Sequence, residues 1–329
     1  MNNIEFAEQR RQPFLDEQSY RSTLELFNSD LNFLREKLKD AEYQHEKASA
    51  LSSRANRLWF TFQLRLTAGE NLDELAKFLT TVVEGFEEWV DALDTVSDDE
   101  YDPPFVLDDV IDTYVDYLNL LSAAVLLHRE DLIPRICALN EGTDYEKSDA
   151  VIEDLLGFFL PDRPTLDGWY WKAYTPLLEA IDQDTPAERA SGMRKFVKGW
   201  YKSMKGVAHF WGKHEKIKPE FSPYYGYWTM CAAAFSYLYG IDDSTYRDEL
   251  VYPKEMADYA RSKPRNPVKL HDGSSILRVL GGQPCPADGQ WFSPAKPDSG
   301  RHFKKGDMMP VFDSEYGQSI WQIVKPDAT

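Results

Sequence analysis

Carboxylates are the residues whose types and spacing could do chemistry in this chain. Asp98-Asp99-Glu100-Tyr101-Asp102 matches DDxxD, the pattern that binds magnesium and a substrate diphosphate in helical prenyl-chain enzymes. Such enzymes need these aspartates on a helix, opposite a second acidic motif. Here Pro103 and Pro104 follow directly and favour a loop. Asp242-Asp243 is no second motif, because Asp248 follows at five residues rather than three. Such an enzyme is the third of three interpretations of the sequence.

Other residues with reactive side chains form no recognisable site. His209 and His214 are five residues apart, so they do not share a helix face as a metal-binding pair would. Cys137, Cys231 and Cys285 are an odd number without zinc-type spacing, which predicts reduced thiols. The sequence has no Gly-rich phosphate loop and no nucleophile motif. We therefore expect no catalytic residue, no cofactor and no metal.

Negative charge is concentrated in the first part of the chain. Residues 1–140 contain 28 acidic and 13 basic residues, whereas residues 141–329 contain 27 and 24. Residues 84–116 hold thirteen carboxylates and no Lys or Arg. Such a surface repels nucleic acid and attracts a basic partner such as a nuclease, although it could also be a solvated helix face. The candidate partner-binding residues in this run are Asp98, Asp99, Glu100, Asp102, Asp108, Asp109, Asp112 and Asp116.

Composition indicates a folded protein. Hydrophobic residues make up 43% and aromatic residues 14% of the 329 residues, which is enough for a core and for two domains. No stretch reaches the roughly eighteen apolar residues of a membrane span, and the amino terminus has no signal-peptide pattern. We expect a cytoplasmic protein that binds neither membrane nor nucleic acid, and we leave a homo-oligomer open.

Helical periodicity dominates the first 260 residues. Apolar spacings of three and four over residues 24–62 predict one long amphipathic helix or a pair broken at Ser52. Further patterns predict a helix over residues 72–96 and another directly after Pro103 and Pro104. Shorter helices are expected at residues 131–139, 148–160 and 169–181, where Gly, Pro or capping residues bound them.

Three more helices are expected before residue 262. Thr185-Pro186 opens the first, whose exposed face is a basic strip that we expect to pair within the protein rather than with nucleic acid. The basic strip comprises Arg194, Lys195, Lys198, Lys202 and Lys205. Pro223 and Gly240 fit the start and end of the second helix, and Pro253 opens the third.

The sequence after residue 262 is rich in Gly and Pro. Residues 291–292, 301–304 and 319–324 are candidate short strands between turn clusters. The predicted fold class is mainly α, a two-part helical bundle with a small irregular C-terminal extension that contains short β-strands. We predict an acidic N-terminal helical domain at residues 1–141, a second helical domain at 142–262 and the extension at 263–329.

Residues 221–261 carry an aromatic-small helix, a Gly-Ile-Asp-Asp turn and a Pro-started helix in fixed order. This combination resembles the C-terminal domain of the PoNi family, immunity proteins that neutralise PoNe-type DNase toxins delivered between competing bacteria, often by type VI secretion. Cys231 departs from the family pattern, which has an acidic residue three places after Trp228. The matching residues are Tyr224, Tyr225, Gly226, Tyr227, Trp228, Ala232, Ala233, Ala234, Gly240, Ile241, Asp242, Asp243, Ser244, Tyr252, Pro253 and Tyr259.

The resemblance implies an antidote without chemistry of its own, which binds a restriction-endonuclease-like DNase toxin in the cytoplasm. On this interpretation the acidic run, or Asp242 and Asp243, covers the basic cleft of the toxin, with Tyr224, Tyr225 and Trp228 as aromatic anchors. Helix packing and capping explain the same residues without a partner. A helical scaffold or adaptor unrelated to toxins is the second interpretation.

Overall fold

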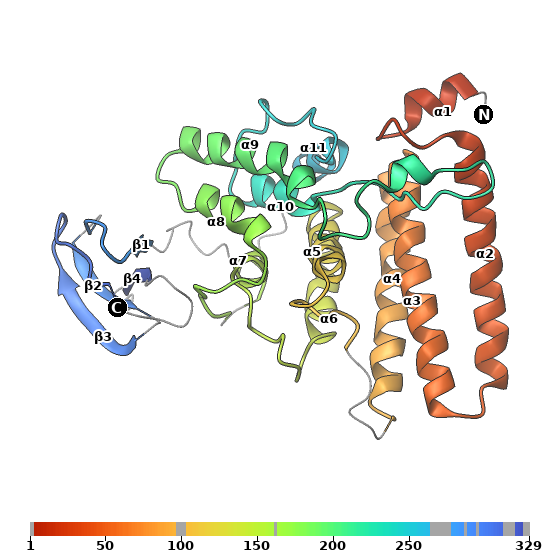
Figure 1. The fold of residues 1–329 in the computed structure, drawn as a ribbon, viewed down its shortest axis with the longest axis horizontal. Helices are drawn as coiled ribbons and strands as arrows, with labels where there is room; N and C mark the ends of the chain where they lie inside the picture. The colour runs from red at the N-terminus through yellow and green to blue at the C-terminus, as the bar shows by residue number, and fades with distance from the viewer. Residues whose placement is uncertain are drawn as a thin grey trace.

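The structure is a computed structural model that describes residues 3–96, 103–160, 163–263, 278–285, 288–293, 296–311 and 320–324. It is mainly α-helical, and a small antiparallel sheet lies at the end of the molecule opposite the long N-terminal helices (Figure 1). The predicted fold class is thereby confirmed.

The long helices of the first half lie side by side (Figure 1). A helix pair over residues 24–62 is confirmed, but its break falls at residues 41–43 rather than at Ser52. Ser52 stays helical because Leu51 and Ala55 on either side of it are buried. The helices of this half are α1 (Asn3–Gln9), α2 (Glu17–Asp40), α3 (Gln44–Thr67), α4 (Leu72–Leu93), α5 (Ile111–Leu126), η1 (Glu130–Leu132, a 3-10 turn) and α6 (Ile133–Ala138).

α4 agrees closely with the helix that the sequence predicts at residues 72–96. The Asn71 side chain accepts hydrogen bonds from the first free amides of the helix, those of Asp73 and Glu74. The predicted apolar stripe is buried, with Leu75 and Leu79 fully enclosed. This apolar face packs on α3 and leaves the acidic residues of α4 on the outside.

The helix expected directly after Pro103 begins only at Ile111. The intervening residues stay irregular because Phe105 and Leu107 insert their side chains into the core. Trp171 Nε1 also donates a hydrogen bond of 2.7 Å to the Leu107 carbonyl. Tertiary contacts therefore override the helical pattern at this point.

The helices predicted at 131–139, 148–160 and 169–181 are present in shortened form. α9 begins where the sequence predicts, because Thr185 and Glu188 form a reciprocal capping box. The second half contains α7 (Ala150–Leu156), η2 (Lys172–Tyr174), α8 (Thr175–Ile181), α9 (Pro186–Ser203), η3 (Lys213–Lys216), α10 (Met230–Leu238) and α11 (Lys254–Ser262).

α10 is shorter than the sequence predicts. It begins at Met230 and not near Pro223, because Gly226 has a φ of +117°, which is incompatible with a right-handed helix. Every residue of α10 is buried, because the helix packs on α5 of the first half and on α9 and α11 of the second. Gly240, with a φ of +64°, follows its end as predicted.

Residues 204–229 connect α9 to α10, and we call them the crossing segment. Figure 1 shows this segment in blue-green, running from the middle of the molecule to the upper ends of α2, α3 and α4 and back. The Ser222 amide donates a hydrogen bond of 2.7 Å to Thr23 Oγ1 of α2. The ring of Tyr225 stacks on Phe60 of α3 with centroids 5.0 Å apart. Residues of the second half thus cover one end of the N-terminal helices.

One buried apolar cluster contains residues from Phe6 to Ala260, a smaller one lies around Trp291 and Trp321, and a third joins Ala48 and Leu51 of α3 to Ala92 of α4. The boundaries predicted at residues 141 and 262 stay predictions. The cluster around Trp291 and Trp321 belongs to a sheet of strand order β1-β4-β2-β3, in which all pairs are antiparallel. The sequence indicated three of these strands but not β1. The strands are β1 (Arg278–Leu280), β2 (Gly289–Ser293), β3 (Lys296–Phe303) and β4 (Ile320–Val324).

Candidate binding pocket at the crossing segment

A cavity of about 390 Å³ lies where the crossing segment meets α3 and α5. Its wall joins residues that the sequence presented as separate candidates, the carboxylates of the acidic run and the aromatic residues after Pro223. Asp112, Asp116, Tyr224, Tyr225 and Trp228 all line it. The structure therefore brings five of the predicted partner-binding residues to one place.

Asp112, in the first turn of α5, fastens the crossing segment to this helix. Its two oxygens accept the backbone amides of His209 and Phe210 at 2.9 and 3.0 Å. The His209 imidazole Nδ1 lies 3.5 Å from Asp112 Oδ2. Both oxygens of this carboxylate therefore already have internal partners.

Asp116 lies one helical turn further along α5 and has a different environment. Trp59 Nε1 and Gln63 Nε2 of α3 donate to its Oδ1 at 2.7 and 3.2 Å. The pKa of the Asp116 carboxyl is raised to about 7, mainly by burial and also by the charge of Asp112, although the hydrogen bonds from Trp59 and Gln63 act in the opposite direction. The pocket thus contains a carboxyl group that changes charge near neutral pH.

The three predicted aromatic residues differ in exposure. Tyr224 and Trp228 are buried, and their polar atoms are used within the fold: Tyr224 Oη donates to Gln12, and Trp228 Nε1 donates to Thr67 Oγ1 at 2.9 Å. Tyr225 stays partly exposed. It is therefore the aromatic ring of the three that can offer surface to a ligand.

Gln12 holds the aromatic wall in place, although sequence reasoning did not single it out. Its side-chain nitrogen donates to the carbonyls of Tyr227 and Leu250 at 2.9 and 2.7 Å. Its side-chain oxygen accepts from the Tyr227 amide and the Tyr224 hydroxyl. The partners of Gln12 lie more than 200 positions away in the sequence. No local pattern of residues could therefore predict this role of Gln12.

Asn119 is a second framework residue that the sequence analysis missed. Its side chain donates to the Trp228 carbonyl and accepts from the Met230 amide, both at 2.9 Å. The second bond satisfies one of the free amides at the start of α10, where Thr229 provides no side-chain cap. α5 thereby fixes both the pocket wall and the helix that follows it.

The other members of the acidic run have varied positions. Asp98, Asp99, Glu100 and Asp102, which form the DDxxD match, lie outside the described residues. Asp108 and Asp109 are exposed before α5, and Asp108 Oδ1 accepts from the Tyr145 hydroxyl at 2.8 Å. A partner-binding role of these residues stays a prediction.

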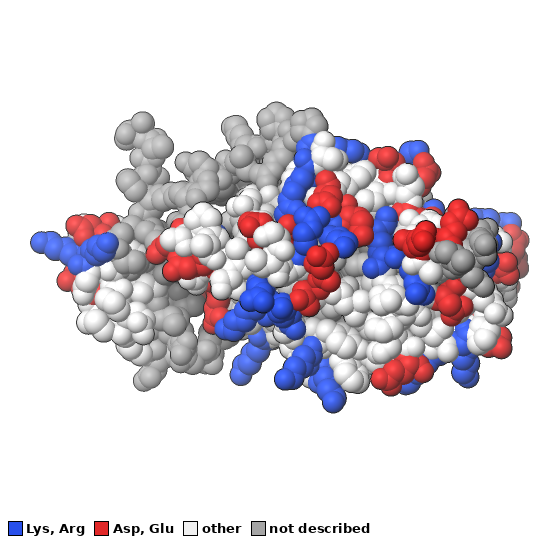
Figure 2. Space-filling model, turned by 90° about the horizontal axis from the view of Figure 1, so that it is seen from above, with Lys and Arg blue, Asp and Glu red and all other residues white. Residues whose placement is uncertain are grey.

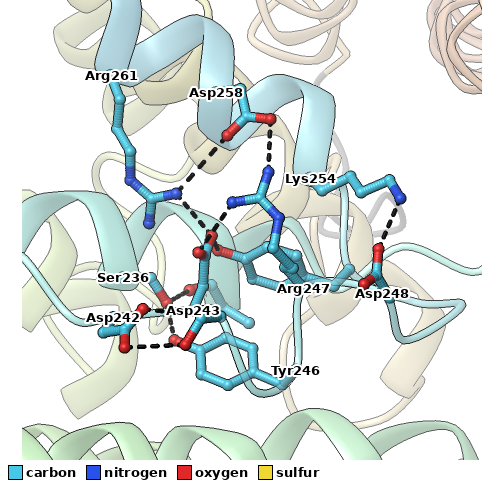
Figure 3. A network of polar contacts seen from close by, with 12 residues as sticks. Ser236, Asp242, Asp243, Tyr246, Arg247, Asp248, Lys254, Asp258 and Arg261 are labelled. Atoms are coloured by element: carbon cyan, nitrogen blue, oxygen red, sulfur yellow. Dashed lines mark hydrogen bonds and ion pairs between the residues drawn. The ribbon is translucent and has the colours of Figure 1, made fainter.

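Asp242 and Asp243 occupy the turn after α10 (Figure 3). Asp242 is exposed and accepts the Ser244 amide at 3.0 Å, as an end-capping residue does. Asp243 is buried and accepts from Arg261 Nη1 at 2.6 Å and from Arg247 Nη1 at 3.2 Å. Asp243 therefore joins the turn to α11 from inside the protein, while Asp242 faces solvent.

The basic strip lies on the exposed side of α9, and Figure 2 shows Lys and Arg side chains gathered over the middle of the molecule on the face seen from above. Lys198 pairs with Glu249 at 3.2 Å, and Lys195 lies 3.8 Å from Glu179. These ion pairs are formed with residues of the second half.

The described residues contain no group of three or more His, Cys, Asp or Glu side chains that could hold a metal ion. None of the helices in the described ranges is both long enough and apolar enough to cross a bilayer. Burial raises the pKa of the Cys231 thiol to about 12, so this thiol, at the position of the expected carboxylate, is uncharged at neutral pH.

Comparison with known proteins gives one family and one fold. Residues 147–256 match the model for the C-terminal part of PoNe immunity proteins (PoNi). The crystal structure of protein PA2201 from Pseudomonas aeruginosa is similar, with a TM-score of 0.62 and 19% identity over 77% of this chain and 91% of that one. No curated protein matches. The crossing segment lies within the family match, whereas α3 and α5, which complete the pocket, lie outside it.

Proposed function

We propose, on the premise that the chain belongs to the PoNi family through residues 147–256, that it is an immunity protein for a PoNe-type nuclease toxin. It acts by binding the toxin in a stoichiometric complex, without a reaction of its own, in the cytoplasm where the DNA lies. The observation that carries this proposal is the family match.

Charge supports a defined surface for the complex. Glu84, Glu88 and Asp91 are exposed on α4, and Asp108 and Asp109 are exposed before α5. A restriction-endonuclease-like toxin needs Lys and Arg around its DNA cleft. Opposite potentials accelerate association by tenfold or more at low salt. The acidic surface would therefore cover the cleft that DNA otherwise occupies.

A growth test decides the function. The reading frame next to the gene for this protein is expressed in a heterologous bacterium, with and without this protein, and chromosomal DNA is followed on gels. We expect loss of DNA and growth with the nuclease alone, and recovery of both when the two are expressed together. Continued DNA loss with both proteins soluble would contradict the proposal and return the chain to the scaffold interpretation.

Charge reversal tests the surface separately. The double variant Asp108→Lys/Asp109→Lys should lower the association rate with the nuclease about tenfold at low salt, and the difference should shrink as salt is added. Glu8→Lys/Glu25→Lys on α1 and α2 is the control, since it changes the net charge equally at exposed positions outside the acidic run. Equal rates for the two variants in stopped-flow measurements would remove Asp108 and Asp109 from the interface.

A further inference from the structure

Asp116 keeps one carboxylate oxygen for a ligand. Both of its donors, Trp59 Nε1 and Gln63 Nε2, reach Oδ1. No described residue donates a hydrogen bond to Oδ2. Asp112, by contrast, has a backbone donor on each oxygen. Asp116 is therefore the acceptor in the pocket that a guest can still use.

Aromatic rings surround this acceptor. Phe60, Tyr225 and Phe210 line the same cavity as Asp116, and the faces of such rings attract cations. An anion would be repelled by two carboxylates, and a neutral guest could donate a hydrogen bond to the oxygen but would leave its charge uncompensated. A planar guanidinium satisfies both features, because it pairs with carboxylates and stacks on rings.

We propose that this pocket receives an arginine side chain of the nuclease, which pairs with Asp116 and stacks against Tyr225. The proposal rests on the proposed function, because it takes the guest from the basic surface that a DNA-cleaving partner must carry. A cavity of about 390 Å³ is large enough for one such side chain, since pockets for small ligands begin at about 300 Å³.

Other ionisable groups face the same space. Asp112 adds a second negative charge, His209 lies beside it, and Tyr224, Tyr225 and Tyr227 line the cavity, while burial, and also the charge of Asp116, raises the pKa of Tyr174. Lys213 lines the cavity with the same charge sign as the proposed guest, and it forms no ion pair with a described residue. Removing Lys213 should therefore strengthen binding, whereas removing the charge of Asp116 should weaken it.

Calorimetry with a catalytically inactive form of the toxin encoded by the adjacent reading frame tests the pair. We expect Asp116→Asn to weaken binding by at least tenfold, Lys213→Gln to strengthen it about twofold to threefold, and Asp91→Asn, an equal charge change on exposed α4, to leave it unaltered. A decrease in affinity for one pocket variant and an increase for the other cannot both arise from general misfolding. Wild-type affinity in Asp116→Asn would overturn the inference, even when the nuclease binds and the proposed function holds.

N-acetylarginine amide tests the pocket if the wild-type protein does not bind the nuclease at all, which would refute the proposed function instead. Fluorescence of the pocket tryptophans should then report millimolar binding of this probe and none of its neutral citrulline analogue. Loss of the signal in Asp116→Asn supports a guanidinium site. Equal responses to both probes, or no response, overturn it.

The pH dependence gives a further readout. The Asp116 carboxyl, with a pKa of about 7, is mostly protonated at pH 6 and mostly ionised at pH 8. Affinity for the nuclease should therefore rise about tenfold over this range, because only the ionised form pairs with a guanidinium. Asp116→Asn should flatten this rise, whereas an identical pH profile in the variant would contradict the pairing.

Discussion

Asp243 and Asp116 are both poorly accessible carboxylates that the sequence offered as partner-binding residues, yet their surroundings differ. Asp243 accepts from two arginines and the Tyr252 hydroxyl, so its charge is neutralised within the protein. Asp116 accepts only from neutral donors and has a raised pKa. Because Arg247 and Arg261 pair with it, Asp243 has a structural role. No cation of the described residues pairs with Asp116, so it can still pair with a cation of a binding partner.

Removal of the Asp243 carboxylate should give the largest effect. Asp243→Ala leaves Arg247, Arg261 and Tyr252 without their common acceptor, so the free energy of unfolding should fall by about 3–5 kcal/mol. Urea denaturation measures this, with Asp242→Asn as the control, because that variant keeps an oxygen that can accept the hydrogen bond of the Ser244 amide in the exposed turn. A loss no greater than that of the control would erase the distinction between the two carboxylates.

A glycine in each of the two regions, the pocket wall and the turn after α10, allows the same comparison for the backbone. Gly226 and Gly240 both have positive φ, but an added Cβ at Gly226 would overlap Trp228 Nε1 and Thr67 Oγ1, whereas one at Gly240 meets nothing within 4 Å. Gly226→Ala should therefore cost about 2–3 kcal/mol and Gly240→Ala about 1 kcal/mol. Thermal unfolding of both variants measures the difference, and equal costs would show that the pocket wall tolerates rearrangement.

Asp116→Asn should have a small effect on stability, and a stabilising one. The folded protein keeps the Asp116 proton up to a pKa of about 7, whereas the unfolded chain releases it near the ordinary pKa of 3.8. The contribution of Asp116 to stability is therefore fully present below pH 3.8 and is lost as pH rises through 7. A pKa rise of this size corresponds to a loss of about 4 kcal/mol in the free energy of unfolding at high pH if the charge is not screened. Solvent in the cavity reduces this loss to about 1–2 kcal/mol.

Denaturation at pH 5 and pH 8 tests this expectation. The gain from Asp116→Asn should be present at pH 8 and much smaller at pH 5, because at pH 5 the wild-type carboxyl already carries its proton. Asp91→Asn provides the exposed control at both values. A gain that does not change with pH would show that Asp116 is ionised throughout this range.

Local features were predictable from the sequence, because they depend on neighbouring residues. The capping box at Thr185 and Glu188 starts α9, and the apolar stripe of α4 is buried as its spacing indicates. The start of α10 was misjudged, because Pro223 has a good first-turn pattern that Gly226 interrupts with its positive φ. Periodicity gives no weight to a single backbone angle.

The pocket itself was beyond sequence reasoning. Its carboxylates and rings were identified one by one, but Asp116 and Tyr225 meet only because the crossing segment returns to α3 and α5. Gln12 and Asn119 hold that arrangement through bonds to residues more than 100 positions away. Charge and aromatic content reveal which residues could bind a partner, whereas long-range packing decides which of them act together.

The crossing segment also determines when the chain can finish folding during its synthesis. Gln12 is made early, but the Tyr227 and Leu250 carbonyls that accept its hydrogen bonds follow 215 and 238 residues later. At a translation rate of about 5–20 residues per second, this delay is roughly 10–50 s. During that time the N-terminal helices lack their cover, so a new molecule completes its pocket only when most of it has left the ribosome.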